Sequence, residues 1–370
     1  MPSTRPVVTY HTRPAHATSG HDVVGRRAVA ARLAATMEAS YEGDFESTAS
    51  YEARPYFVPD DALDRGTAMR LGIVAADDLF GGVVPHAFVA TKAITHGLCD
   101  GDARAPDGWA PAFGSEVEDA VLRGYTAFSH ADALRAVRLL LDLGPVRLKR
   151  CDGIGGGGQE VVESGADAKR ALAAIDQEAL ASTGIVVEEN LAGVTTYSVG
   201  QVSAGGIVLS YCGTQRTVRN ARGNDVYGGS TLECVRGGLE ALGALSLADD
   251  ARNAVEFARR YDAAAMRAYP GLFASRRNYD VAHGADACGK ARVGVLEQSW
   301  RAGGASGAEV RALEAFLADA GVDHVRASTV ETYEPEPVVP PGAFVYFQGL
   351  DAHGSPLTKY ATLSPDADAR

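Results

Sequence analysis

The feature that most limits what this chain can fold into is a run of four glycines between two stretches of β-forming residues. In the segment PVRLKRCDGIGGGGQEVV, a predicted strand from Val146 to Lys149 precedes the glycines, and a second, from Glu160 to Glu163, follows them. Glycine has no Cβ and adopts backbone conformations that other residues avoid, so the pattern predicts a hairpin with a glycine-rich connection. An isolated glycine run is usually a surface linker, but a linker seldom lies inside a hairpin.

The lysine and the glycines of this segment together suit a phosphate group. Lys149 ends the first strand, and unhindered backbone N–H groups close over phosphate oxygens when they come from glycines, here Gly155, Gly156, Gly157 and Gly158. This is not a Walker A loop, because no Gly-Lys-Ser/Thr follows and the next element is a strand. We therefore expect a flap over nucleotide phosphates with Lys149 as its cation.

Length, charge and cysteine usage narrow the class of protein. The 370 residues allow two or three packed subdomains, and 46% hydrophobic with 22% charged residues is ordinary globular usage, which argues against long disorder. A formal net charge of −12 disfavours nucleic acids and anionic membranes as partners. We see no signal-peptide core and no apolar run near the ~20 residues of a membrane span. Because the five cysteines also form no CxxC pair, we expect a cytoplasmic protein.

The periodicity predicts two kinds of architecture along the chain. Strand–helix units near the start predict a small parallel sheet, with strands at 7–10 and 55–58 and helices at 23–37 and 62–71. Later helices are expected at 130–143, 166–181, 247–269 and 307–320. Alternating runs from residue 185 onward predict mainly antiparallel sheet, and the proline-rich segment EPEPVVPPG precedes a last hairpin.

A second candidate segment, VVEENLAG, ends a predicted strand. A chain passing an adenine ring there can offer backbone N–H and C=O groups to its edge, with a carboxylate accepting from the exocyclic amine. Glu188 is the expected carboxylate, while Glu189 and Leu191 would supply backbone groups. A solvated strand edge is the alternative for two adjacent acids.

Two carboxylates are expected to face each other in a further hairpin. RRNYDVAHG and ARVGVLEQSW flank a turn, and centring that turn near residues 288–289 places Asp280 opposite Glu297. Like charges in this position destabilise a sheet unless a cation joins them, and Mg²⁺ is commonly bound by one or two carboxylates plus substrate phosphates. A salt bridge to Arg277 or Arg301 is the alternative.

Arginines follow these strands at two places. Arg301 lies beside a Gly-Gly turn after Glu297, where a permanent positive charge suits phosphoryl or acyl-phosphate chemistry, unless it only packs on Trp300. Arg216 lies in SYCGTQRTVRNARGNDVYGGS, which suits either anion contacts or a solvated loop. No metal-ligand spacing joins the histidines that could act as acids or bases, which are His86, His96 and His283.

The order of these motifs resembles the ATP-grasp superfamily. Its patterns read PVxxKxxxGGGGxG, vEeyL and ExNxRxGG, and this chain has PVRLKRCDGIGGGGQ, VEENL and EQSWRAGG between about Lys92 and Ser306. The sequence as a whole also resembles an uncharacterised bacterial family within that superfamily, with a distant likeness to carboxylate-amine ligases and biotin carboxylase. Lys92 then matches the first ATP lysine and Lys149 the second. The implied metal ligands are Asp280, Glu297 and Ser299, with serine in place of the usual asparagine.

The resemblance implies an α/β (α+β) ATP-grasp fold with four segments. These are an N-terminal Rossmann-like pre-ATP-grasp subdomain, a flap subdomain with the glycine loop, an antiparallel C-terminal subdomain with the metal site, and a connector with a hairpin, at 1–91, 92–193, 194–330 and 331–370.

The implied cofactors are ATP and Mg²⁺, and the implied reaction activates a small-molecule carboxylate as an acyl phosphate for capture by an amine or thiol. The catalytic residues would be Lys149, Arg301 and Arg216. The resemblance also leaves a homodimer as one option for the oligomeric state. The alternatives are a phosphotransferase, or a nucleotide-binding protein without turnover. The latter is favoured by Ser299, and by threonines where the family usually has a ribose-binding acid.

Overall fold

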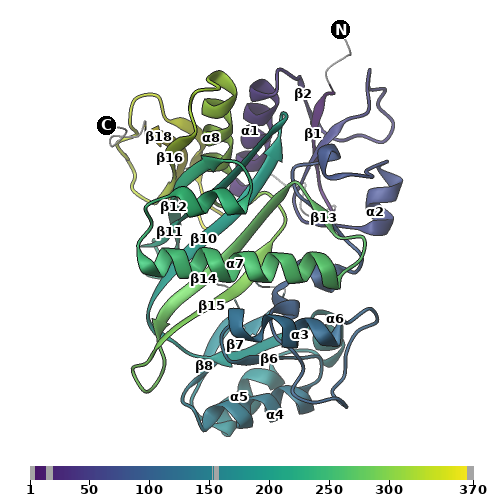
Figure 1. The fold of residues 1–370 in the computed structure, drawn as a ribbon, viewed down its shortest axis with the longest axis vertical. Coiled ribbons are helices and arrows are strands. Elements are labelled where there is room, and N and C mark those ends of the chain that lie inside the picture. Colours follow the sequence, from purple (N-terminus) through teal and green to yellow (C-terminus); the bar gives the residue numbers. More distant parts are fainter. Residues whose placement is uncertain (1–4, 14–19, 152, 154–157, 365–370) are drawn as a thin grey trace.

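The computed structural model describes residues 5–13, 20–151, 153 and 158–364. Within this part of the chain the strands form four sheets, of three, eight, three and four strands, and helices cover their faces (Figure 1). Across these residues, we find no helix with the length and apolar character needed to cross a membrane.

The N-terminal subdomain contains the small parallel sheet that the strand–helix pattern predicts. Both outer strands run parallel to the central one, in the order β2 (Tyr41–Asp44), β1 (Val7–Tyr10) and β3 (Tyr56–Pro59). Sequence reasoning misses β2, because YEGD has no apolar alternation. Helix α1 (His21–Thr36) packs its apolar side between this sheet and the rest of the molecule.

A short second helix begins later than the sequence pattern predicts. The structure has α2 at Arg65–Arg70, because the Asp64 side chain accepts a hydrogen bond from the Thr67 N–H and caps the helix there. The two residues before it instead form a strand of a small mixed sheet, whose members are β4 (Leu63–Asp64), β5 (Gly82–Val84) and β13 (Phe273–Ala274).

The largest sheet is antiparallel throughout and has helices on both faces. Its order is β15 (Ala291–Ser299), β14 (Arg276–Ala285), β10 (Ala192–Ala204), β11 (Ile207–Arg219), β12 (Asp225–Arg236), β16 (His324–Thr332), β18 (Pro356–Ser364) and β17 (Phe344–Leu350). Adjacent residues on β11 show the two faces, since Cys212 packs towards α7 (Asp249–Ala268) and Tyr211 towards α8 (Ser306–Ala318) and α1. The last hairpin, β17 and β18, therefore belongs to the same sheet as β14 and β15, which carry the predicted metal ligands. Strand β16 crosses residue 330, where the sequence analysis placed the end of the C-terminal subdomain.

The flap subdomain is a four-stranded antiparallel sheet with helices packed on it (Figure 1). Its order is β6 (Gly124–Ala127), β9 (Ile185–Glu189), β7 (Val146–Arg150) and β8 (Gln159–Val162). The predicted hairpin is present, with Lys149 of β7 paired to Gln159 of β8. The predicted 166–181 helix is wrong in one respect. It is two helices, because Asp176 accepts from two backbone N–H groups and starts a new one.

The remaining helices are short or lie on this flap sheet. They are η2 (Ala76–Asp78), η3 (Ala87–Ala90), η4 (Lys92–Thr95), α3 (Pro111–Val117), η5 (Glu118–Ala120), α4 (His130–Leu141), α5 (Gly165–Ala173), α6 (Gln177–Thr183) and η6 (Leu239–Ala244).

Candidate active site

Both predicted lysines reach the same strand of the large sheet from different elements. Lys149, on β7, has its Nζ 3.5 Å from the Leu296 carbonyl oxygen of β15. Lys92, in η4, has its Nζ 2.7 Å from Oε2 of Glu297 on the same strand. Lys92 Nζ also donates to the Gly153 carbonyl oxygen at 3.0 Å, in the connection that follows β7. The stem of the glycine loop, the two lysines and β15 are therefore brought together.

Gly158 is the member of the predicted glycine flap that the structure describes, since Gly155, Gly156 and Gly157 lie outside the described residues. Its φ is +72°, in the left-handed region where glycine is favoured, and its carbonyl oxygen accepts from the Arg150 N–H at 3.0 Å. A Cβ at this position would lie 3.2 Å from the Arg150 side chain. Gly158 thus closes the connection at the entry to β8.

Glu188 is a buried carboxylate held between a lysine and a histidine. Its Oε1 lies 2.7 Å from Lys149 Nζ and its Oε2 lies 3.2 Å from His96 Nε2. Burial alone raises the pKa of Glu188, but the Lys149 charge and the His96 hydrogen bond outweigh it and bring the pKa to about 2. Burial lowers the pKa of His96, so a neutral ring with its proton on Nε2 fits this contact.

Sequence reasoning misses His96 as a partner of this group. A lone histidine has no spacing signal, and the two residues are 92 positions apart. The ring is also wedged against β6, because a Cβ on Gly124 would lie 2.7 Å from His96 Nε2. The nearest signal in the sequence is its place in TKAITH, directly after the first lysine.

Glu189 joins the flap subdomain to the large sheet instead of facing the same space as Glu188. Its Oε1 accepts from the Arg123 N–H and from Arg292 Nε, each at 3.0 Å. Its own N–H donates to the Arg123 carbonyl oxygen at 2.9 Å, so this N–H is already hydrogen-bonded within the protein. That Glu189 and Leu191 supply backbone groups to adenine stays a prediction. Leu191 is 6% exposed and packs against Ala282 of β14.

The predicted carboxylate pair is present on β14 and β15. Asp280 is directly opposite Glu297, and a bulge follows, so that Val281 faces Val295. Asp280 Oδ1 accepts from Asn278 Nδ2 at 2.9 Å and also from the amide of Gln215. Burial and the facing charge of Glu297 both raise the pKa of Asp280. This position therefore favours a cation or a proton between the two carboxylates.

The donor set fits a magnesium ion shared with phosphate oxygens. Within the described part of the chain no group of three or more His, Cys, Asp or Glu side chains is arranged to hold a metal, so Asp280 and Glu297 would need further oxygen atoms from a ligand. Mg²⁺ binds in this way, keeping water and taking one or two carboxylates plus phosphates. Ser299, the predicted third ligand, accepts through Oγ from Arg276 Nη1 at 3.3 Å, so a cation lies beside it.

A buried ion pair lies behind the carboxylates. Arg276 Nη2 is 2.7 Å from Glu309 Oε1, and both side chains are almost fully buried. Tyr211 Oη lies 2.6 Å from Glu309 Oε1 and 2.9 Å from Asn278 Oδ1. The network therefore connects α8 to the strand that carries Asp280. Its members come from segments far apart in the sequence, which is why sequence reasoning did not find it.

The two predicted catalytic arginines lie in different places. Arg301 follows β15 and forms an isolated β-bridge with Gly81, next to the N-terminal subdomain. Arg216 is exposed, and its Nε donates to the Gly228 carbonyl oxygen at 2.9 Å. Because side chains alternate along β11, Arg216 points away from the face on which Gln215 contacts Asp280.

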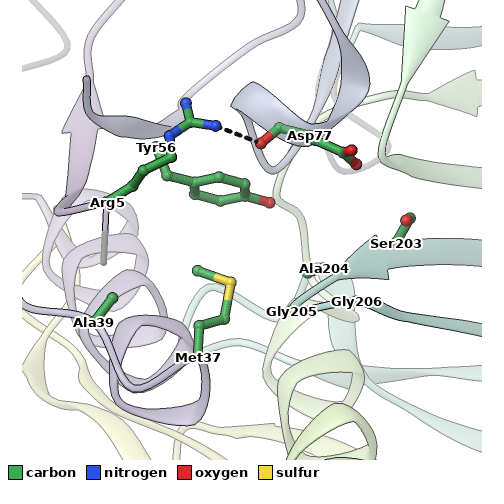
Figure 2. A pocket seen from close by; sticks show the side chains of 9 residues that line it. All are labelled: Arg5, Met37, Ala39, Tyr56, Asp77, Ser203, Ala204, Gly205 and Gly206. Carbon is green, nitrogen blue, oxygen red and sulfur yellow. Dashed lines mark hydrogen bonds between the residues drawn. The ribbon is translucent and has the colours of Figure 1, made fainter. Parts of the chain in front are cut away.

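A cavity of about 480 Å³ lies away from this site, near the amino ends of β1 and β3 (Figure 2). The Tyr56 ring and the Met37 side chain border its hollow, opposite the Gly205–Gly206 turn. Arg5 also lines it but donates to the carbonyl oxygens of Arg54, Pro55 and Asp77. The lining includes none of the predicted site residues, so we place the chemistry at the lysines and carboxylates.

The profile of the family described as "Protein of unknown function (DUF3182)" matches residues 7–361. The search of curated proteins found no match.

Solved structures resemble nearly the whole chain. Phosphoribosylamine–glycine ligase from Thermotoga maritima has 17% identity and a TM-score of 0.51, covering 98% of this chain and 92% of that one. N5-carboxyaminoimidazole synthetase from Staphylococcus aureus, complexed with ADP, has 9% identity and a TM-score of 0.52, covering 100% and 95%. Biotin carboxylase from Campylobacter jejuni, as a β,γ-ATP complex, has 12% identity and a TM-score of 0.50, covering 98% and 88%. The molecule has the ATP-grasp fold that the motif order predicts.

Proposed function

The chain belongs to the DUF3182 family, and from that membership and its ATP-grasp fold we propose that it is an ATP- and Mg²⁺-dependent ligase. It would activate a carboxylate as an acyl phosphate, which an amine or thiol then captures. One observation carries the proposal. Lys92 and Lys149 meet β15, the strand that holds Glu297 opposite Asp280.

The lysines and the flap would hold the nucleotide. Lys149 and Lys92 are the cations for its phosphate oxygens, and glycine backbone N–H groups would close over them. Glu188 fixes the position of Lys149 through the 2.7 Å ion pair, so little reorganisation is needed when phosphate arrives. Lys92 would exchange Glu297 for phosphate when the nucleotide enters.

Asp280 and Glu297 would hold magnesium together with phosphate oxygens. When bound, the ion neutralises charge on the transferred group. Burial and the facing charge of Glu297 raise the pKa of Asp280, which supports a divalent cation at this pair. Ser299 would contribute at most a weak oxygen, because its hydroxyl already accepts from Arg276.

In the proposed reaction, a substrate carboxylate oxygen attacks the γ-phosphorus and the bond to the β,γ-bridging oxygen breaks, which gives ADP and an acyl phosphate. The amine or thiol then attacks the acyl carbon, inorganic phosphate leaves, and the nucleophile loses a proton. Arg301 would stabilise the anionic groups, because it follows the metal strand closely. The names of the similar structures, a glycine ligase, a synthetase and a carboxylase, support this class of reaction.

A nucleotide-binding protein without turnover is the second candidate. It is favoured by the Arg276 guanidinium beside Ser299, where the family pattern has an asparagine ligand.

The decisive experiment measures ADP, AMP and phosphate release from Mg-ATP, with carboxylate and amine or thiol libraries added singly and together. A ligase should release ADP and phosphate only when both partners are present. Release with a carboxylate or alcohol alone would indicate a phosphotransferase, binding without release would indicate the second candidate, and AMP would contradict an acyl phosphate.

Matched variants test the residues in the same assay. Lys149→Gln and Glu297→Gln should each lower the rate by about 100-fold or more, the scale of one electrostatic contact to the reacting group. Lys290→Gln, an exposed lysine in the β14–β15 turn, is the control and should keep the wild-type rate.

A further inference from the structure

Gln298 lies between two predicted metal ligands, at a position that the pattern ExNxRxGG leaves open. It follows Glu297 and precedes Ser299 on β15. Because side chains alternate along a strand, Gln298 points to the opposite face of the sheet from Glu297. There its side chain is buried and contacts Tyr261 of α7. A buried amide needs hydrogen-bond partners, and the partners of this one indicate its role.

The Gln298 amide donates to the backbone directly before Lys92. Its Nε2 lies 2.9 Å from the Val89 carbonyl oxygen and 2.6 Å from the Thr91 carbonyl oxygen. Its Oε1 accepts from Tyr261 Oη at 3.1 Å. An amide nitrogen has two hydrogens to donate, so both are used here, and the tyrosine hydroxyl fixes which way the amide points.

The same strand contacts the lysine segment at successive residues. Gln298 contacts residues 89–91, and Glu297 pairs with Lys92 Nζ at 2.7 Å. The carbonyl oxygen of the residue before Glu297 accepts from Thr95 Oγ1 at 3.3 Å. The segment therefore runs along β15, which is the outermost strand of the large sheet. The strand of the predicted metal ligands thus also sets where the first lysine lies.

The ion pair between Lys92 and Glu297 cannot hold the lysine once nucleotide is bound. In the proposed function Glu297 turns to magnesium and Lys92 turns to a phosphate oxygen. The hydrogen bonds of Gln298 lie on the other face of the sheet, so they can persist through this exchange. A segment without them would have to be ordered on binding, which costs affinity.

We propose that Gln298 is a positioning residue, which holds Lys92 in the nucleotide site through the carbonyl groups of Val89 and Thr91. The inference rests on the proposed function, because Lys92 is expected to contact the nucleotide phosphates. It goes beyond that function by assigning a role to a side chain on the opposite face of the sheet from the carboxylate pair.

The first measurement is amide hydrogen exchange in the protein without nucleotide. Gln298→Leu removes both donors, so exchange in a peptide covering residues 86–96 should become about tenfold faster, the scale of one lost hydrogen bond. Gln201→Leu is the matched control. It removes another glutamine of the large sheet, whose Oε1 accepts from the Leu239 N–H at 3.2 Å, and this peptide should then exchange as in wild type.

The second measurement is calorimetric titration with Mg-ATP in a double-mutant cycle. Gln298→Leu alone should weaken the Kd about tenfold, the scale of one hydrogen bond to a charged group. In protein that already carries Lys92→Met, it should weaken the Kd by less than about twofold, because its effect passes through that lysine. Gln201→Leu should bind Mg-ATP as wild type does.

The proposal is overturned if the 86–96 peptide exchanges at the wild-type rate in Gln298→Leu. It is also overturned if this variant weakens Mg-ATP binding equally with and without Lys92, the result expected of a structural role alone. If Gln298→Leu does not fold, Gln298→Met decides on the same criteria, because its unbranched side chain fits irregular space.

Failure of the nucleotide site is read separately from failure of the positioning role. If wild type binds no Mg-ATP, the proposed function is overturned, and the role of Gln298 in nucleotide binding with it. Faster exchange in Gln298→Leu would still support the hold of the amide on residues 89–91, because that measurement needs no nucleotide.

Discussion

The two acid–lysine groups of the candidate site differ in how far water reaches them. On the flap side, Glu188 and Lys149 have side chains 2% and 4% exposed, and His96 completes the contact. On the sheet side, Lys92 pairs with Glu297, whose side chain is 35% exposed and faces the second carboxylate of Asp280. The first group is satisfied by protein alone. The second has an excess of negative charge, which a ligand can correct.

The two groups therefore suit different roles, since the flap-side group positions a lysine and the sheet-side group can bind a ligand. A satisfied, buried ion pair keeps a lysine in one place, whereas a half-exposed acid pair can exchange its lysine for a metal and phosphate. The following changes should affect the two groups differently, beginning with the largest effect.

Removing each lysine should give unequal losses of stability. Lys149→Met leaves the Glu188 charge buried without its main partner and should cost about 3–5 kcal/mol of unfolding free energy. Lys92→Met should cost about 1 kcal/mol or less, because water can solvate Glu297. Urea unfolding of both variants measures the difference, and equal losses would contradict the contrast.

Acid should affect the two groups with opposite sign. Because the pKa of Glu188 is lowered from 4.5 to about 2, its contribution is present above the unfolded pKa and is lost as the pH falls towards 2, a change of about 3 kcal/mol. The pKa of Asp280 is raised, so its contribution favours the folded state at low pH and is lost as the pH rises. Unfolding at a series of pH values should show each effect disappear in Glu188→Gln and Asp280→Asn respectively.

Replacing His96 tests whether it positions Glu188. His96→Phe leaves Oε2 of Glu188 without this partner and should cost about 1–3 kcal/mol, while His96→Gln can still donate and should cost less. If both variants lose equal stability, the role of His96 is packing alone. Mg-ATP affinity should follow the same order, because Lys149 is held through Glu188.

The sheet-side acids should matter for ligand more than for folding. Asp280→Asn removes one of two facing like charges, so stability without ligand should stay the same or rise by about 0.5 kcal/mol. Glu297→Gln also takes the carboxylate partner from the buried Lys92, so it should lower stability without ligand. Each should weaken Mg-ATP binding about tenfold, or about 1.4 kcal/mol. Calorimetry with Mg-ATP and with ATP plus EDTA checks this, and an unchanged affinity with magnesium would remove the pair from the metal site.

Local chemistry made part of this fold predictable from the sequence. The glycine-rich connection identified the β7–β8 hairpin, and the turn between β14 and β15 set the register that pairs Asp280 with Glu297. Strand–helix alternation predicted the parallel N-terminal sheet.

What was not predictable depends on contacts between distant residues. His96 and Glu309 have no motif of their own, and the role of each depends on a partner that the fold brings near. The Asp176 cap that divides the 166–181 helix is local, but an aspartate within a helical pattern does not by itself reveal a break. Bulges such as that after Asp280 also follow from packing more than from a turn signal.

The ion pair between Glu189 and Arg292 has a mechanical consequence. It ties the flap sheet to the large sheet near the start of β7, where Glu189 is paired with Val146, while Lys149 lies towards the other end of that strand. A rotation of the flap sheet about this ion pair would move Lys149 farther than Glu189, because Lys149 lies farther from the pair. A small rotation would therefore give a larger displacement of the lysine that we expect to contact the phosphates.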